Sequence, residues 1–211
     1  MRCTVCGTGG RQLCDACRVA LPRLRPPFCG RCGAPTAWPV ARCRECSGRR
    51  LGFASARAAL AYDEDVRRVV AAWKERGLRR LASEAAELVA ETLPPPGAPV
   101  LAFVPADHDR TLRRGHHPAE RLALELGERW SLPVVPLVAR VRSVRHQRGL
   151  KLGERRRNVA GAFAPAAKAP AAVALVDDVY TSGATAAAAA SALRKGGARR
   201  VDVVTFARVV R

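Results

Sequence analysis

Apolar residues along the chain fall into short runs separated by amphipathic stretches. Four apolar runs have the length of buried strands: 99–106, 134–141, 171–179 and 201–210. Four stretches have apolar residues at helical spacing and predict helices: 63–76, 78–93, 118–131 and about 183–195. Residues 53–62 predict an extended segment or a hairpin. Strands that alternate with helices predict an α/β fold, a parallel sheet flanked by helices on both faces.

All eight cysteines lie within the first 46 residues, in four Cys-x-x-Cys pairs: Cys3/Cys6, Cys14/Cys17, Cys29/Cys32 and Cys43/Cys46. Two such pairs make one four-thiolate zinc site, so the sequence predicts two structural Zn²⁺ ions. Gly7 and Gly33 suit the tight turn beneath a metal-bound thiolate. We favour sequential pairing because each ribbon then stays local, although a cross-braced arrangement also fits the spacing. The disulfide alternative requires an oxidising compartment, of which the sequence gives no sign.

The distribution of cysteines changes sharply along the chain, because none follows residue 46. This change predicts a boundary near residue 50, with a double zinc-ribbon domain at 1–50 and a larger α/β domain at 51–211. Residues 1–50 contain too few aliphatic side chains for a core of their own. We therefore expect this part of the chain to depend on zinc for its folding.

Basic residues outnumber acidic ones by 37 to 18, which gives a net charge of +19. Such a charge favours a polyanionic partner or an anionic substrate. Only four of the basic residues are lysines, so a GC-rich genome is an alternative source of the arginine excess. No stretch approaches the roughly 18 apolar residues of a membrane helix, and no secretory apolar region follows Met1. We expect a cytoplasmic protein without membrane insertion.

Residues 173–185, VALVDDVYTSGAT, combine an apolar strand with two acids and a polar loop. Val173–Val176 predicts the buried strand, with Asp177 and Asp178 at its carboxyl end, where parallel sheets bind ligands. Carboxylates accept hydrogen bonds from a vicinal diol such as that of ribose. The loop places hydroxyls and backbone N–H groups at a helix N-terminus, which suits phosphate: Thr181, Ser182, Gly183, Ala184 and Thr185.

The predicted ligand of this motif is therefore a ribose 5-phosphate. The alternative is a strand followed by an ordinary polar helix cap. The motif lacks the GK[ST] of a Walker A loop and the GxGxxG of a dinucleotide-binding fingerprint, which disfavours ATP and NAD.

The 173–185 run resembles the phosphoribosyl-pyrophosphate signature of type I phosphoribosyltransferases. With the cysteine pairs, YDEDVRRVVAAWKERG (62–77), Arg114-Gly115 and QRGLKLGERRRNVAGAF (147–163), nearly the whole chain resembles the ComF competence family of phosphoribosyltransferase-like proteins. That family's Q-x-x-L-x-x-x-x-R-x-x-N pattern is met by Gln147, Leu150, Arg155 and Asn158. The resemblance implies a type I phosphoribosyltransferase fold with an N-terminal double zinc ribbon.

The chain departs from the family pattern at three places. The usual R-G-F-N-Q is here RGHHP (114–118), Val144 stands where a threonine is common, and the usual V-P-V-P is VPAD (104–107). These departures leave the ribose phosphate motif whole and concern the other half of the reaction centre. We interpret His116 and His117 either as exposed loop residues or as catalytic acids or bases.

The resemblance also implies roles for the remaining motifs. Mg²⁺ would bridge the pyrophosphate and the ribose hydroxyls of phosphoribosyl pyrophosphate, and Asp177 and Asp178 would be the catalytic acids. Residues 104–107 would meet pyrophosphate, and the arginine-rich stretch 140–158 would be the mobile loop that closes over the substrate or, alternatively, a path for a nucleic-acid backbone. Further candidates for the anionic site are Lys74, Pro105, Ala106, Arg114, Gln147, Arg155 and Asn158.

Two classes of function compete for this chain. The first is an active phosphoribosyltransferase of nucleotide metabolism, in which an acceptor displaces pyrophosphate from C1 of the ribose. The second is a non-catalytic protein that handles single-stranded DNA during uptake in natural transformation, with a helicase or other competence proteins as partners. Aromatic residues make up only 5% of the chain, so backbone electrostatics would dominate DNA binding. A ligand-sensing regulator is disfavoured because no DNA-reading motif is recognisable.

Overall fold

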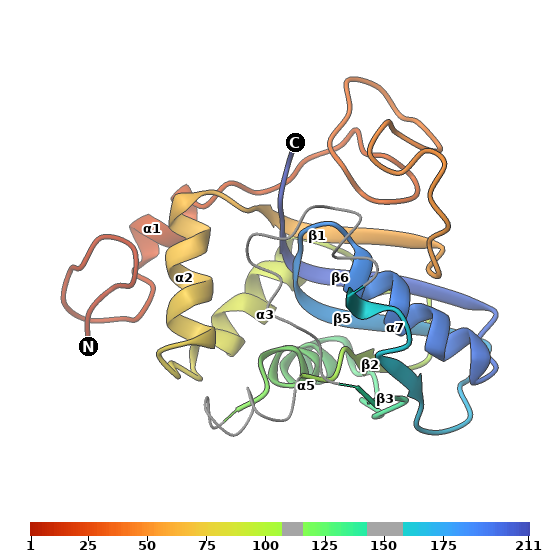
Figure 1. Ribbon diagram of the computed structural model, residues 1–211. Coiled ribbons are helices and arrows are strands. Elements are labelled where there is room, and N and C mark those ends of the chain that lie inside the picture. The colour runs from red at the N-terminus through yellow and green to blue at the C-terminus, as the bar shows by residue number, and fades with distance from the viewer. Residues whose placement is uncertain (107–115, 143–157) are drawn as a thin grey trace.

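A four-stranded parallel sheet forms the centre of the molecule (Figure 1). The computed structural model describes residues 1–106, 116–142 and 158–211. The strand order is β1-β6-β5-β2, with the bounds β1 Ser55–Ala61, β2 Leu101–Phe103, β5 Ala172–Tyr180 and β6 Arg200–Arg208. The predicted parallel sheet flanked by helices is confirmed.

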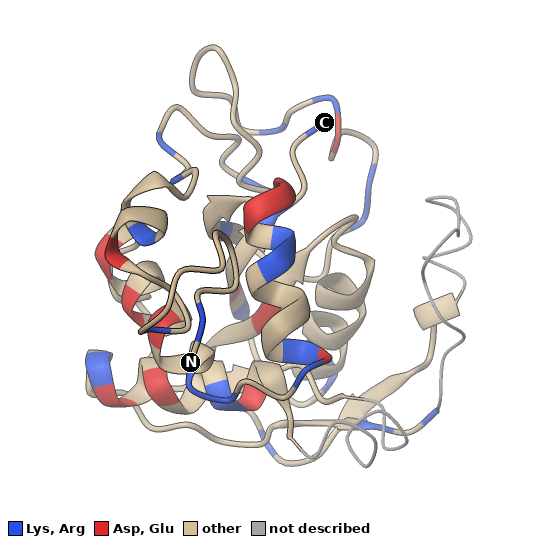
Figure 2. Cartoon of the chain, turned by 90° about the vertical axis from the view of Figure 1, so that its left-hand side faces the viewer, with Lys and Arg blue, Asp and Glu red and all other residues tan. Residues whose placement is uncertain are grey.

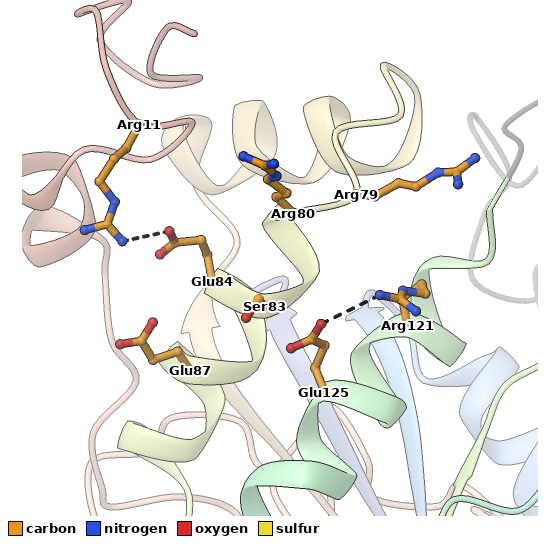
Figure 3. A pocket seen from close by; sticks show the side chains of 8 residues that line it. All are labelled: Arg11, Arg79, Arg80, Ser83, Glu84, Glu87, Arg121 and Glu125. Carbon is orange, nitrogen blue, oxygen red and sulfur yellow. Dashed lines mark hydrogen bonds and ion pairs between the residues drawn. The ribbon is translucent and has the colours of Figure 1, made fainter.

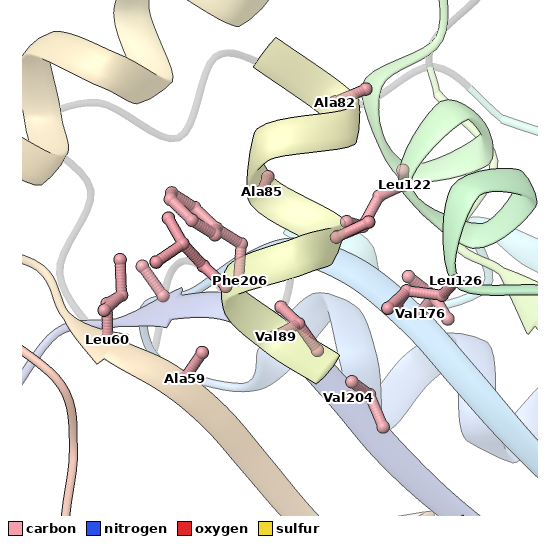
Figure 4. Close-up of a cluster of buried hydrophobic side chains, with 14 of the residues drawn as sticks. Ala59, Leu60, Ala82, Ala85, Val89, Leu122, Leu126, Val176, Val204 and Phe206 are labelled. Carbon is pink, nitrogen blue, oxygen red and sulfur yellow. The ribbon is translucent and has the colours of Figure 1, made fainter. Parts of the chain in front are cut away.

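Helices cover both faces of this sheet, and each face has its own core. One face carries α2 (Glu64–Lys74), α3 (Leu81–Thr92) and α5 (Pro118–Trp130). The other carries α7 (Ala184–Lys195). Along β5, Ala174 and Val176 pack in the first core and Val173 and Leu175 in the second, as the alternation of strand side chains requires. Figure 4 shows α3 and α5 side by side on the first face of the sheet, with Val89 of α3 near Val204 of β6 and Leu126 of α5 near Val176 of β5.

The run at 53–62 forms one strand and not a hairpin. As β1 it pairs in parallel with β6, from Ser55 opposite Asp202 to Ala61 opposite Arg208. Its middle residues Ala58, Ala59 and Leu60 are buried. Paired residues of β1 and β6 are 147 positions apart in the sequence. Local pattern alone therefore does not reveal the pairing.

The run at 134–141 does not join the parallel sheet as a full strand. Val134 makes one bridge to Leu101 of β2, and the chain then continues to β3 (Val138–Arg140), which pairs antiparallel with β4 (Phe163–Pro165) in a separate two-stranded sheet. The prediction of a fourth parallel strand here is wrong. Pro133 and Pro136 lack the N–H groups that a continuous ladder needs, which explains the interruption.

The first 50 residues form two cysteine-bearing segments that lie apart from each other. The first, with the short helix α1 (Asp15–Ala20), lies beside α2, and the second lies near β1 and the C-terminus (Figure 1). Leu13 and Leu21 of the first segment join the core under α2 and α3, whereas Cys29 and Cys46 of the second join the core under α7. None of the helices in the described ranges has the length and apolar character needed to span a bilayer.

Candidate ligand site and two cysteine clusters

The predicted ligand motif lies where the chain leaves β2 and β5 toward opposite faces of the sheet. From β2 the chain passes to α5, and from β5 it passes to α7 on the other face. Beyond the carboxyl ends of two such strands, open α/β sheets form a ligand crevice. β2 pairs with β5 only as far as Val176. The acids Asp177 and Asp178 therefore lie beyond the end of β2, along an edge of β5 that β2 leaves uncovered.

The strand β5 follows the apolar run predicted at 171–179 and continues past its buried part, Val173–Val176. β5 continues to Tyr180 because β6 keeps pairing with it, from Asp177 opposite Thr205 to Tyr180 opposite Arg208. The acids thus stand within a strand and not in the following loop. Successive strand side chains point to opposite faces, so one ligand can meet both acids only at the strand edge between those faces.

The acid pair is held by local hydrogen bonds and by Lys74. Asp177 Oδ1 accepts from the N–H of Asp178 at 2.9 Å, and Asp178 Oδ1 accepts from the N–H of Val179 at 2.6 Å. Lys74 Nζ, at the end of α2, lies 2.6 Å from Asp178 Oδ2. The structure thus brings Lys74, a weak candidate from the sequence, directly to the acids.

Burial raises the pKa of Asp177 to about 7, and the neighbouring charge of Asp178 adds to the rise, while Lys74 and Arg140 oppose it. Part of the Asp177 surface is still accessible to solvent. The proton on Asp177 is therefore released close to neutral pH, as expected for a group in a functional site.

The loop after β5 has the backbone shape of an anion-binding turn. Gly183 has φ +70°, and a Cβ there would strike the hydroxyl of Tyr180, so glycine is required. Ser182 is buried, and its Oγ accepts from the N–H of Ala184 at 3.3 Å. The N-cap residue of α7 is Gly183 itself, which has no side chain to bond the first turn. N–H groups at such a helix end suit a phosphate, and Thr185 is partly buried there.

Two sets of hydrogen bonds hold the segment after β2. The N–H of Val104 donates to the carbonyl of Val176 at 3.0 Å. Arg140 donates to the carbonyl of Pro105 through Nε at 3.1 Å and through a terminal nitrogen at 3.0 Å, and its guanidinium lies 4.6 Å from the centre of the Phe163 ring. These contacts fix residues 104–106 at the same end of the sheet as Asp177 and Asp178.

His117 begins α5 and touches the same segment. Its ring lies between the backbone N–H groups of Glu120 and Ala106. Burial lowers the pKa of His117, so the ring is neutral and has one acceptor nitrogen for these two donors. Pro118 follows at the first helical position. The departure RGHHP therefore supplies a helix cap followed by a proline that suits the first turn. His116 is buried, so its interpretation as an exposed residue is wrong.

Several predicted contacts fall outside the described residues. These are Arg114, Gln147, Arg155, Asp107 and the arginines between 143 and 157. Asn158 is described, and its carbonyl accepts from Arg142 at 2.9 Å. Thr181 is partly buried in the loop before α7.

The eight cysteines gather into two groups of four, as sequential pairing predicts: Cys3, Cys6, Cys14 and Cys17, and Cys29, Cys32, Cys43 and Cys46. Within each group the ligand atoms lie within 4.8 Å of one another. A tetrahedral zinc ion with Zn–S bonds of about 2.3 Å places its sulfurs about 3.8 Å apart. The Cys32–Cys43 and Cys29–Cys46 sulfurs are 3.5 and 3.6 Å apart, too far for a disulfide. Both groups are compatible with structural zinc.

The turns of the two groups confirm the predicted role of glycine. Gly7 has φ +80° and Gly33 has φ +70°. A Cβ on Gly33 would also strike the carbonyl oxygen of Ala56 in β1. The second cysteine group is thus pressed directly against the edge of the sheet.

The first cysteine group docks on α3 through charged side chains. Glu84, Glu87 and Glu91 form one stripe of that helix, and Arg18 lies 3.1 Å from Glu87 and 2.6 Å from Glu91. Arg11 lies 2.9 Å from Glu84. Figure 2 shows basic and acidic residues side by side on the helices of this side of the molecule.

A cavity of about 460 Å³ lies at this same junction and not at the acid pair. Its lining comprises Arg11, Arg79, Arg80, Ser83, Glu84, Glu87, Arg121 and Glu125 (Figure 3). Arg11 and Arg121 are turned toward Glu84 and Glu125, with which they form ion pairs. Paired charges of both signs do not select one class of ligand. This cavity is therefore a weaker candidate for a ligand site than the acid pair.

Comparison with known proteins supplies a relative over most of the chain. No family model matches. Competence protein F of Haemophilus influenzae is 29% identical over 208 residues, which cover 93% of this chain and 90% of the relative. The predicted resemblance to the ComF competence family is confirmed.

The ComF-like chain also superposes in part on solved structures. A glutamine phosphoribosylpyrophosphate amidotransferase of B. subtilis matches at 19% identity and a TM-score of 0.42, over 59% of this chain and 26% of that enzyme. The chain thus spans about a quarter of the length of that enzyme. The adenine phosphoribosyltransferase of Thermoanaerobacter pseudethanolicus matches at 14% identity and a TM-score of 0.40, over 69% and 87% of the two chains.

Proposed function

We propose that this ComF-like protein binds phosphoribosyl pyrophosphate with Mg²⁺ beyond the carboxyl ends of β2 and β5. The observation that carries the proposal is the acid pair Asp177 and Asp178, with Lys74 against it, shortly before the α7 N-terminus, whose N-cap residue is Gly183. The acids offer acceptors for ribose hydroxyls, and the helix N-terminus offers donors for the 5-phosphate.

In this proposal, different residues of the site bind different parts of the ligand. Residues 181–185 hold the 5-phosphate, and the carboxylates of Asp177 and Asp178 face the ribose. Lys74 balances the charge of Asp178 and offers a positive charge to the pyrophosphate. Carboxylate oxygens are ligands that Mg²⁺ accepts, and the ion supplies charge neutralisation for the pyrophosphate when it is bound.

The direct test is calorimetry with phosphoribosyl pyrophosphate and Mg²⁺. Asp177→Asn with Asp178→Asn removes both carboxylates, and we expect binding to be lost. A matched control is Asp65→Asn with Asp202→Asn, which removes two carboxylates on the start of α2 and near the start of β6, where they face Arg68 and Arg200. The control should bind as the wild type does. Equal binding by the site variant would refute the assignment.

Transfer of the ribose phosphate to an acceptor is a separate part of the proposal. Release of pyrophosphate, measured with a panel of bases and amines, distinguishes a phosphoribosyltransferase from a binding protein. Turnover with any acceptor favours the enzyme. Binding of phosphoribosyl pyrophosphate without turnover favours a binding protein, and the name of the Haemophilus relative supports a role in competence.

A second candidate function, contact with single-stranded DNA, is supported by exposed side chains of the second cysteine segment. Trp38 is 69% exposed, and four arginines of the same segment are exposed: Arg25, Arg42, Arg44 and Arg50. An indole suits a stacked base, and guanidinium groups suit its phosphates. We expect binding that weakens steeply with salt, because phosphate contacts release counterions. Affinity unchanged between low and moderate salt would rule this mechanism out.

A further inference from the structure

The ligand loop after β5 is tethered to the second cysteine cluster by two arginines. The first is Arg49, three residues after Cys46. It donates to the carbonyl of Ser182 at 2.5 Å and to the carbonyl of Glu45 at 3.3 Å. Its own N–H donates to the carbonyl of Cys46 at 3.2 Å. The turn that carries Cys43 and Cys46 is therefore one side chain away from the phosphate loop.

The second tether is Arg208, at the end of β6. Only 1% of this residue is exposed, although it is charged. It donates to the carbonyl of Cys32 at 2.6 Å, and it lies 3.0 Å from the carboxylate of Glu45. An arginine buried this deeply is stable only when such partners replace water. Arg208 thus binds the knuckle at Cys32 and the turn at Glu45 together.

Tyr180 transmits this contact to the loop. The guanidinium of Arg208 lies 5.1 Å from the centre of the Tyr180 ring, and Phe53 packs on the ring edge at 6.3 Å between centroids. The hydroxyl of Tyr180 contacts Gly183, where it leaves no room for a Cβ. The Tyr180 ring and the Arg208 guanidinium together fix the left-handed turn at Gly183 that begins α7.

The segment that joins Arg49 to the cysteines, and that Arg208 contacts, has no helix or strand of its own. Residues 44–48 form successive turns. A short stretch without such structure keeps its shape through the ion that its cysteines bind. The four sulfurs of this cluster fit a tetrahedral ion, as shown above. The first cluster differs, because its described contacts reach α2 and α3 and none reaches residues 180–185.

We propose that Arg49 and Arg208 are positioning residues through which the second cysteine cluster sets the shape of the phosphate loop, and so the affinity of the ligand site. This inference rests on the proposed function for its consequence in affinity. The geometric part, that metal at the second cluster orders residues 181–187, stands without any ligand.

Amide hydrogen exchange of the full, zinc-loaded chain tests the geometric part. We expect Arg49→Ala to speed exchange at residues 181–187 by about tenfold, because a hydrogen bond from a charged group is lost. Arg49→Lys, which retains a donor, should restore most of the protection. Arg50→Ala is the matched control, since Arg50 is the exposed neighbour, and it should leave exchange at 181–187 unchanged.

The two clusters are compared in the same experiment. Cys43→Ser with Cys46→Ser should reproduce the faster exchange at 181–187, and adding Arg49→Ala should increase it little further. Cys3→Ser with Cys6→Ser should not change it. Equal acceleration by both cysteine pairs would overturn the inference. If the Cys43 and Cys46 variant fails to fold, Arg49→Ala decides alone, and unchanged exchange in that variant overturns the inference.

The consequence for binding is measured separately. Calorimetry with phosphoribosyl pyrophosphate and Mg²⁺ should show about tenfold weaker binding by Arg49→Ala, with recovery in Arg49→Lys. Wild-type protein that does not bind this ligand would refute the proposed function and leave the exchange result standing. Wild-type binding that Arg49→Ala does not weaken would refute the link between cluster and site.

Discussion

The two cysteine clusters have the same ligands but are attached to the molecule in different ways. The first has an exposed cysteine, Cys6, and docks on the glutamate stripe of α3 through guanidinium groups near the surface. The second is largely buried, shares a core with α7, and is fixed by the buried Arg208. The Cys-x-x-Cys pairs are the same in both, so they predict the metal chemistry but not the surroundings of each cluster. The first segment contacts α2 and α3, and the second contacts the proposed ligand loop through Arg49.

Removal of the metals one cluster at a time should separate these roles with the largest effect. Wild type should contain two zinc ions per chain, and each double serine variant about one. Cys43→Ser with Cys46→Ser should lower the free energy of unfolding by several kcal/mol, because structural zinc contributes its binding energy to folding. Cys3→Ser with Cys6→Ser should cost less. Thermal unfolding with metal analysis measures both, and an equal loss of stability would contradict the comparison.

The arginines that dock the two clusters should differ as well. Arg208→Met leaves Glu45 without its buried partner and should cost about 3–5 kcal/mol of stability. Arg18→Met breaks pairs with half-exposed glutamates and should cost about 1 kcal/mol or less. Denaturant unfolding of both variants measures the difference. Similar costs would mean that the two clusters are docked with similar strength.

The acid beside the loop gives a third test, which depends on pH. Because burial raises the pKa of Asp177 to about 7, the folded state holds a proton that the unfolded state has lost above pH about 4. Stability therefore falls between these two values as pH rises. Asp177→Asn abolishes the effect, so its gain in stability over wild type should grow toward pH about 7 and then level off, at on the order of 4 kcal/mol.

Unfolding at a series of pH values from about 5.5 to 8 measures this gain. Wild type and variant carry the same zinc clusters, so the loss of metal at low pH largely cancels in the difference. A gain that is independent of pH would show that Asp177 has an ordinary pKa.

The smallest expected effect is on single-stranded DNA binding by exposed side chains of the two cysteine segments. Trp38→Ala on the second segment should weaken single-stranded DNA binding by about 1 kcal/mol, the low end for one stacked base. Val19→Ala, which truncates a 73% exposed side chain on the first segment, is the control and should leave binding unchanged. Fluorescence anisotropy at fixed salt measures both. Equal weakening would remove the second cluster from the nucleic-acid interface.

The sequence predicted the elements of the site better than their connections. The strand, the acid pair and the loop of 173–185 are contiguous, so their order alone places them together. The four helices follow from local periodicity, and Asp63 caps α2 as an acid at that point should. The two zinc groups follow from spacing.

The missed features depend on contacts between distant residues. Arg208 ends an apolar strand, and nothing near it in the sequence indicates that Cys32, 176 residues away, receives its hydrogen bond. Arg49 and Ser182 are 133 residues apart. The antiparallel pairing of β3 joins residues about 25 positions apart, and only Pro133 and Pro136 signal in the sequence that the parallel ladder is broken. The ion pair of Lys74 with Asp178 does not follow from the sequence, because helical position alone does not show which strand a side chain meets.

The most direct test of the account is one calorimetric titration of the zinc-loaded wild type with phosphoribosyl pyrophosphate and Mg²⁺, repeated in the presence of ribose 5-phosphate. We predict that each chain binds one ligand through its ribose and 5-phosphate, so that ribose 5-phosphate competes for the site and weakens the observed binding. A titration without heat from folded protein at several temperatures, or binding that ribose 5-phosphate does not affect, would contradict it.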